Sequence, residues 1–185
     1  GGSVDMDGEA RIWGAAVDIG CDEVIPGSVT GGLDVLISAV ATQVVAGTEL
    51  TFEAVIEGRA LGFAWDWSDG TLTSNRWDAS HAWSSAGSYE VVLDAWNDSA
   101  SASATVGVTV VDSFTNYVSL SGSHTEPFKS WATAATQLQS AVDACLAGGV
   151  VLVAEGTYSN GTYMANGVSH RLGVWKHMRG EATNA

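Results

Sequence analysis

The sequence predicts a mainly β protein with a two-sheet sandwich at its centre. Apolar side chains alternate with small or polar ones over residues 61–67 and again over residues 89–95, the pattern of strands with one buried face. The polar stretch Ser68-Asp69-Gly70 between them supplies a turn. The 185 residues include 22 glycines, 2 prolines and 46% apolar residues, which suits a β fold with many turns around a real core.

We assign residues 33–112 to this sandwich, with about seven short strands in chain order. The first strand is expected over residues 35–41, and a turn follows at Ala46-Gly47-Thr48. The remaining strands are expected over 50–57, 61–67, a short crossing through Leu72, the approach to Trp83, 89–95 and 102–110. Strand number and spacing are those of a sandwich of two antiparallel sheets.

The loop and strand motifs of this segment resemble the PKD domain, an immunoglobulin-like module. The family pattern runs W-D-F-G-D-G, then H-x-Y, then G-x-Y-x-V-x-L-x-V-x-N. The residues that match the pattern or stand at its positions are Trp65, Asp66, Asp69, Gly70, His81, Trp83, Gly87, Tyr89 and Asn97. The resemblance implies a structural domain in which Asp66 and Asp69 hold the loop by accepting backbone hydrogen bonds, and it favours this role over a catalytic carboxylate pair.

Three positions depart from the PKD pattern. Trp67 replaces the usual phenylalanine, Ser68 the usual glycine and Trp83 the usual tyrosine. Because serine is less comfortable than glycine in a left-handed backbone conformation, we expect the loop to be shaped differently at Ser68. Tyr89 is expected to act as a tyrosine corner, with its hydroxyl bonded to upstream backbone.

The first segment, residues 1–32, resembles the closing strands of bacterial right-handed β-helix domains. The resemblance rests on the run Ala16-Val17-Asp18-Ile19-Gly20-Cys21-Asp22-Glu23. Pro26-Gly27-Ser28 and Gly31-Gly32 then predict a short linker into the sandwich.

The last segment, residues 113–185, resembles the N-terminal cap of the same β-helix architecture. Apolar residues at helical spacing predict one α-helix over 131–147, with Ser130 as its N-cap and Gly148-Gly149 at its end. The run 150–153 then predicts a buried strand. Both flanks are therefore expected to be short β-solenoid-like coils, which need neighbouring coils to cover their apolar faces.

The net charge of −14 is unevenly distributed along the chain. Residues 1–32 hold six acids and one base, residues 33–112 eleven acids and two bases, and residues 113–185 four of each. Such an acidic surface repels phosphate backbones and anionic lipids, so nucleic-acid binding is excluded as a function. No apolar run approaches membrane-spanning length, so membrane insertion is not expected.

The sequence carries no catalytic motif of a known hydrolase, nucleotide-binding or zinc type, and we expect no enzyme activity and no cofactor. His170 and His177 lack cysteine or carboxylate neighbours at metal spacing. Some PKD domains bind calcium near an acidic linker, and the resemblance makes Asp22, Glu23 and Asp34 the candidate ligands here. Three scattered acids do not specify such a site.

Two cysteines, Cys21 and Cys145, allow two interpretations. They are either two small buried thiols, which we favour, or a disulfide that joins the flanking segments within one chain or between chains.

Tryptophans are the candidate ligand contacts, because exposed indoles stack on sugar faces. Trp65 and Trp83 are expected in the core as PKD-pattern positions, Trp67 on the same inward face, and Trp131 in the buried stripe of its helix. Trp77 and Trp96 remain as possible contacts with a glycan or a protein partner.

We therefore expect a non-catalytic extracellular or cell-surface module with a structural or adhesive role. Its ends suggest self-association, with head-to-tail assembly into a filament, or contact with neighbouring domains of a larger surface protein. The alternatives are an accessory segment of a polysaccharide-acting β-helix enzyme and a glycan-binding module that uses Trp77 and Trp96.

Overall fold

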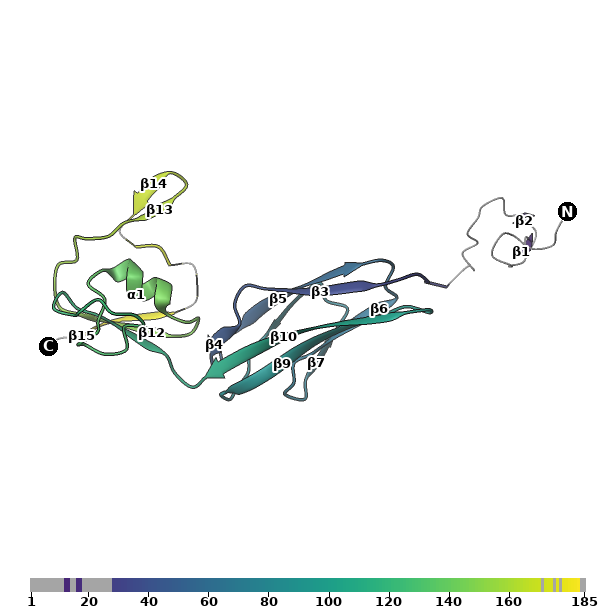
Figure 1. Cartoon of the computed structure of the whole chain (residues 1–185), viewed down its shortest axis with the longest axis horizontal. Helices are drawn as coiled ribbons and strands as arrows, with labels where there is room; N and C mark the ends of the chain where they lie inside the picture. Colours follow the sequence, from purple (N-terminus) through teal and green to yellow (C-terminus); the bar gives the residue numbers. More distant parts are fainter. Residues whose placement is uncertain are drawn as a thin grey trace.

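A computed structural model describes residues 12–13, 16–17, 28–170, 172–174, 176 and 178–183. The protein is mainly β with one helix, and Figure 1 shows the central sandwich followed by a smaller C-terminal unit that carries the helix. The elements are β1 (Ile12–Trp13), β2 (Ala16–Val17), β3 (Asp34–Ala39), β4 (Gln43–Val45), β5 (Leu50–Glu57), β6 (Gly62–Asp66), β7 (Leu72–Ser74), β8 (Asp78–His81), β9 (Gly87–Trp96), β10 (Ser101–Val111), β11 (Thr115–Val118), α1 (Leu138–Ala144), β12 (Val150–Ala154), β13 (Tyr163–Ala165), β14 (Val168–His170) and β15 (Arg179–Thr183).

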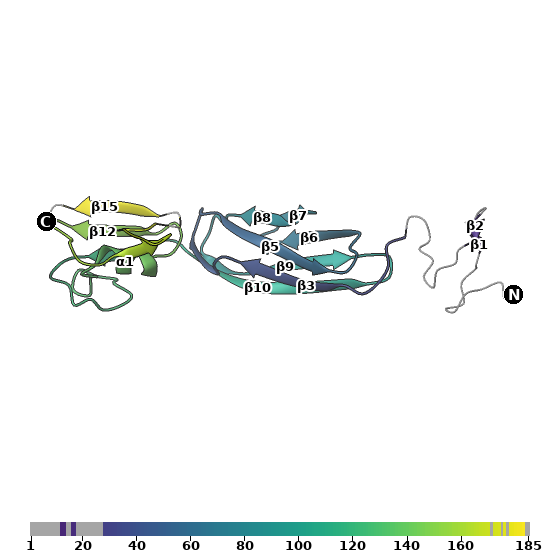
Figure 2. The same ribbon diagram turned by 90° about the horizontal axis from the view of Figure 1, so that it is seen from above.

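The predicted sandwich is confirmed, with one additional strand. One sheet has the order β4-β10-β9-β6-β7 and the other the order β3-β5-β8, and the two lie face to face in Figure 2. All pairings in both sheets are antiparallel except that of β4, which runs parallel to β10. The sequence analysis missed β4, because a strand of three residues is too short to show an alternating pattern.

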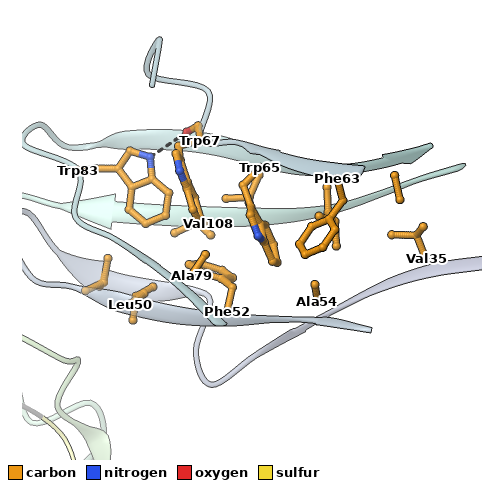
Figure 3. Close-up of a cluster of buried hydrophobic side chains, with 14 of the residues drawn as sticks. Val35, Leu50, Phe52, Ala54, Phe63, Trp65, Trp67, Ala79, Trp83 and Val108 are labelled. Atoms are coloured by element: carbon orange, nitrogen blue, oxygen red, sulfur yellow. Dashed lines mark hydrogen bonds between the residues drawn. The ribbon is translucent and has the colours of Figure 1, made fainter. Parts of the chain in front are cut away.

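Aromatic side chains fill the space between the two sheets, as Figure 3 shows. Trp65 and Trp67 are stacked with ring centroids 5.5 Å apart, and Phe52 from the opposite sheet contacts both. Trp83 closes this cluster with its ring edge toward Trp67. Leu61 was expected on the same inward face, but it precedes β6 and is 55% exposed, because the strand begins only at Gly62.

The C-terminal unit is built on a parallel sheet of order β11-β12-β15. Its strands are in register, so Thr115 pairs with Val150 and Val150 with Arg179. Helix α1 packs on β11 and β12, and the chain then forms the β13–β14 hairpin before it returns as β15. A second apolar core lies in this unit; its most buried members are Val118, Phe128, Ala135, Ala141, Cys145 and Val151.

The helix is much shorter than the expected 131–147. It spans Leu138–Ala144, and Ser130 caps only a preceding turn through the bond from the Thr133 N–H to its hydroxyl, at 3.2 Å. The backbone of Ala135 bonds instead to β11, donating to the Tyr117 carbonyl and accepting from the Ser119 N–H, both at 2.9 Å. This pairing pulls residues 131–137 out of helical geometry.

Trp131 is consequently not in a buried helical stripe as expected. It is 42% exposed and meets Tyr117 edge-on, with ring centroids 4.8 Å apart. Most of the β-helix-like segment expected over 1–32 lies outside the described residues, apart from the short pairing of β1 with β2 and the linker from Ser28. In the described part of the chain, no helix has the length and apolar character needed to cross a bilayer.

Candidate binding surfaces of the sandwich and its junctions

The acidic side chains of the 65–70 loop are engaged in holding that loop. Asp66 accepts a hydrogen bond from the Ser68 N–H at 2.8 Å. One oxygen of Asp69 accepts from the Thr71 N–H at 3.0 Å and from the Thr71 hydroxyl at 2.6 Å. Gly70 has φ +90°, the left-handed conformation that glycine tolerates best. Both carboxylates thus serve as turn acceptors.

Ser68 adopts a left-handed backbone conformation with φ +58°. Serine thus occupies a left-handed conformation that is less comfortable for it than for the glycine of the PKD pattern. The Ser68 hydroxyl donates to the Glu90 carbonyl on β9, and this bond ties the loop to the neighbouring strand and offsets the steric cost of a Cβ atom in this conformation.

His81 connects the loop to the aromatic core. Its Nε2 lies 2.7 Å from the second carboxylate oxygen of Asp69, and its ring stacks on Trp67 with centroids 4.9 Å apart. Trp83 meets the same imidazole edge-on at 4.8 Å and donates its indole N–H to the Trp67 carbonyl at 2.9 Å. His81 is therefore placed as a structural imidazole at one end of the sandwich.

The Asp69 carboxyl gives the loop a pH dependence. Partial burial raises its pKa, but the hydrogen bonds from Thr71 and His81 together outweigh burial, so the pKa of Asp69 lies below its ordinary value of 3.8. A carboxyl group whose pKa is lower in the folded than in the unfolded protein stabilises the folded state. This contribution is complete at pH values above the pKa that the group has in the unfolded chain, and it is lost as the pH falls through the pKa that it has in the folded protein. The loop is thus weakened in acid.

We predict that Asp69→Asn lowers the free energy of unfolding at pH 7 by about 1 kcal/mol, because it removes charge-assisted hydrogen bonds at a partly exposed site. The measurement is urea unfolding at pH 7 and in steps below pH 4. The loss relative to the parent protein should shrink as the pH falls below 4. A loss that is constant from pH 7 to pH 2.5 would contradict this role of the carboxylate.

The turn between β9 and β10 holds the linker that precedes the sandwich. Asp98 accepts from the Val29 N–H at 2.7 Å, and the Asp98 N–H donates to the Val29 carbonyl at 2.8 Å. Asn97 donates from its side chain to the carbonyls of Gly31 and Arg59 at 2.9 and 3.0 Å. The PKD-pattern asparagine therefore fixes the entry of the chain into the sandwich.

The two remaining pattern residues of β9 lie near its start. The Tyr89 hydroxyl donates to the Ser85 carbonyl at 3.0 Å, the geometry of a tyrosine corner. Gly87 lies against the Tyr89 ring, where a Cβ would be 3.3 Å from the nearest ring atom.

A second junction connects the sandwich to the C-terminal unit. The Val45 N–H at the end of β4 donates to the Ala147 carbonyl at 3.0 Å, while the Ala46 N–H donates to the Val111 carbonyl of β10 at 2.8 Å. Gly148 has φ +80° and lies directly against Thr48. Sequence reasoning missed this junction, because its bonds are made by backbone groups that carry no residue signature.

The two candidate ligand tryptophans are both exposed but differ in their surroundings. Trp77 is 54% exposed and lines a hollow of about 350 Å³. Trp96 is 39% exposed, and a Cβ on Gly62, its cross-strand partner, would lie 2.9 Å from the indole ring. The Trp96 indole thus packs against Gly62 of its own sheet, whereas Trp77 borders the hollow.

The other candidate sites gain little support from the described residues. Cys145 is a buried free thiol whose pKa is raised by that burial, and Cys21 lies outside the described residues. Asp34 is the first residue of β3 and lies opposite Glu57 of β5 in the sheet. The other two candidate calcium ligands, Asp22 and Glu23, lie outside the described residues. Within the described ranges no three His, Cys, Asp or Glu side chains are grouped to hold a metal ion. His170 is at the end of β14, and His177 is not described.

Several solved structures are similar to part of this chain. A study of carbohydrate-binding modules from the β-sandwich superfamily gave a chain that is 18% identical, with a TM-score of 0.41; the match covers 46% of this protein but only 37% of that chain. The PKD1 domain of Vibrio anguillarum Epp is 20% identical, with a TM-score of 0.37 and coverage of 43% and 94%. The PKD domain of the human receptor SorCS2 is 24% identical, with a TM-score of 0.36 and coverage of 53% and 96%.

No curated protein matches the chain significantly. Residues 34–110 match the sequence profile of the PKD domain family. The matched range begins with β3 and ends within one residue of the end of β10. The match covers the part of the chain that folds as the two-sheet sandwich, and residues 34–110 are therefore similar in sequence to the PKD domain family.

Proposed function

We propose that this chain is a non-catalytic extracellular structural module that extends by stacking a further parallel coil on its C-terminal end. The observation that carries the proposal is the parallel sheet β11-β12-β15, whose strands are in register. The three strands follow one another in chain order, and after each strand the chain returns to place the next strand beside it. Such a ladder is the repeating unit of a solenoid, and each added coil covers the apolar side of the last. This architecture agrees with the β-helix resemblance of residues 113–185.

The last coil of this ladder has exposed apolar side chains that a neighbouring coil could cover. An apolar hollow of about 150 Å³ borders β15 at Gly180, and its lining includes Leu138 and Val151. Leu172 and Val174 line it as well and are 43% and 55% exposed. Within the described part of the chain, β15 is also an edge strand of its sheet, and its outer backbone groups can pair with a further parallel strand. In a solution of the pure protein that strand must come from a second copy, which gives head-to-tail association.

The non-catalytic and extracellular parts of the proposal rest on different observations. The carboxylates of Asp66 and Asp69 bond to loop N–H and hydroxyl groups, which leaves them poorly placed for acid–base chemistry. An extracellular location is what the PKD domain implies. Backbone bonds at Val29 and at Val45 join the sandwich to the segments on both sides, and these bonds suit a spacer that keeps its neighbours in a fixed orientation.

We predict that Gly180→Pro weakens self-association by about tenfold or more, whereas Gly180→Ala does not. The Arg179 N–H donates inward to the Gly149 carbonyl at 2.9 Å, so the next N–H, that of Gly180, points to the open edge. Proline removes that donor without breaking a bond to β12, and a Cβ at Gly180 meets nothing within 4 Å. Sedimentation velocity over a dilution series measures the effect. A parent protein that remains monomeric at all concentrations, or equal association of the two variants, would refute the stacking proposal.

A further inference from the structure

The hollow beside Trp77 has the features of a small ligand site at the end of the sandwich where β5 turns into β6. It has a volume of about 350 Å³ and is lined in part by Arg59, Leu61, Asn75 and Trp77. The indole of Trp77 rests on the buried Phe63, with ring centroids 4.8 Å apart, yet 54% of Trp77 is exposed. The Trp77 ring is therefore packed against Phe63 and is also accessible to solvent. Ligand sites are commonly lined by aromatic side chains together with a few polar groups.

The backbone around this surface is fixed. The Trp77 carbonyl accepts from the Ala54 N–H of β5 at 2.8 Å, and the Arg76 carbonyl accepts from the Trp65 indole N–H at 2.9 Å. Asn75 accepts from the Phe63 N–H at 3.0 Å. The platform is therefore held in place before any ligand arrives, which reduces the entropy lost on binding.

One of the two cations of residues 33–112 lines this hollow. The segment has eleven acids but only two bases, Arg59 and Arg76. Arg59 lines the hollow, and Arg76 directly precedes Trp77 in the chain. Among the described residues the ion pairs are His81–Asp69 and Arg179–Glu181, so neither guanidinium group is within ion-pair distance of a carboxylate there.

The local charge can attract an anion although the whole protein is acidic. At physiological ionic strength exposed charges are largely screened beyond about 8 Å, so the potential in the hollow depends mainly on groups that line it. Asp98, which belongs to the neighbouring turn, is bonded to the Val29 N–H. Two further acids, Asp34 and Glu57, lie opposite each other on β3 and β5, and Glu57 directly precedes Gly58 of the lining, but neither carboxylate lines the hollow. Arginine recognises a carboxylate through two parallel hydrogen bonds.

We propose that this hollow binds an acidic sugar unit of a polysaccharide, that is, a uronate residue. One face of the pyranose ring lies on the Trp77 indole, and the sugar carboxylate pairs with Arg59. The inference goes beyond the structural role proposed above and does not depend on it. It also separates the two exposed tryptophans, because Trp96 is occupied in covering Gly62.

The test is affinity electrophoresis of the full chain in native gels that contain polygalacturonate, with dextran as the neutral polymer. Polygalacturonate should retard the parent protein and dextran should not. Arg59→Gln should weaken binding by about tenfold, the effect of losing a charge-assisted pair. Its fold should be intact, since only the Arg59 carbonyl bonds within the described structure.

Two further variants make the test specific. Arg179→Gln removes the same charge from the C-terminal unit, where Arg179 is 71% exposed in its side chain, and should bind polygalacturonate like the parent. Trp77→Ala should abolish retardation while the circular dichroism spectrum is kept. Absence of retardation of the parent, equal retardation by dextran, or equal binding by Arg59→Gln and Arg179→Gln would each overturn the proposal.

Discussion

Trp67→Ala is expected to lower the free energy of unfolding of the sandwich by about 4 kcal/mol, the scale of a large-to-small substitution in a closed core. Trp67 is 1% exposed, and its ring stacks between Trp65 and His81 at 5.5 and 4.9 Å. Its indole N–H also donates to the Thr73 hydroxyl at 3.1 Å, which ties β7 to the core. Alanine leaves a cavity among rigid rings that cannot collapse to fill it.

The matched control is Trp67→Phe, since phenylalanine is the usual residue of the PKD pattern at this position. Phenylalanine keeps the stack on Trp65 and His81 but loses the hydrogen bond to Thr73, so a smaller loss of about 1–2 kcal/mol is expected. Urea unfolding followed by tryptophan fluorescence and by circular dichroism measures both. Equal losses for alanine and phenylalanine would contradict a role for the ring stack, as would a loss below 1 kcal/mol for alanine.

The core of the sandwich was predictable from sequence because burial there follows strand alternation. Phe63, Trp65 and Trp67 recur every second residue, and all three are 5% exposed or less. The same logic failed for Leu61, since alternation says nothing about where a strand begins. The alternation of apolar and polar residues therefore predicts which face of a strand is buried better than it predicts where the strand begins and ends.

The helix was overpredicted for a related reason. Trp131, Ala134, Ala135 and Leu138 recur at helical spacing, but the backbone of Ala135 pairs with Tyr117 and Ser119 of the β11 region. Those partners are 16 to 18 residues away in the sequence. Local spacing cannot reveal a competing long-range backbone pairing, and tertiary context overrides helix propensity here.

The candidate sites were predictable only in part. That Trp77 and Trp96 are exposed follows from the absence of a core role for either, and both are in fact exposed. Which of them borders a hollow depends on neighbours that the sequence does not show. Gly62 is the cross-strand partner of Trp96, and Phe63 packs against Trp77. The junction at Val45 and Ala147 consists of backbone groups, and such contacts leave no pattern of residue types.

Gly148→Ala is expected to lower the free energy of unfolding by about 3 kcal/mol by disrupting the junction with the C-terminal unit. A Cβ there would lie 2.0 Å from the Thr48 hydroxyl oxygen and 2.9 Å from the Thr48 Cβ, so the two units must shift apart. Gly148 also has φ +80°. Left-handed strain of about 1–2 kcal/mol adds to overpacking of about 1–3 kcal/mol.

Gly47→Ala separates these two effects. Gly47 lies in the same junction with φ +78°, but a Cβ there meets nothing within 4 Å. It should therefore cost only the backbone strain, about 1–2 kcal/mol. Adding Thr48→Ala to Gly148→Ala removes the closest clashing atom and should restore part of the loss, which a double-mutant cycle can measure.

Hydrogen exchange at the Val45 amide reports the junction directly, because that N–H donates to the Ala147 carbonyl across it. In Gly148→Ala the Val45 amide should exchange much faster than in the parent, while amides of the β9–β10 ladder stay protected. In Gly47→Ala it should remain protected. If Val45 stays protected in Gly148→Ala, the clash has been absorbed within the junction. The bond from Val45 to Ala147 would then hold the two units together even without the close fit at Gly148, and the fixed orientation of the spacer would not depend on that glycine.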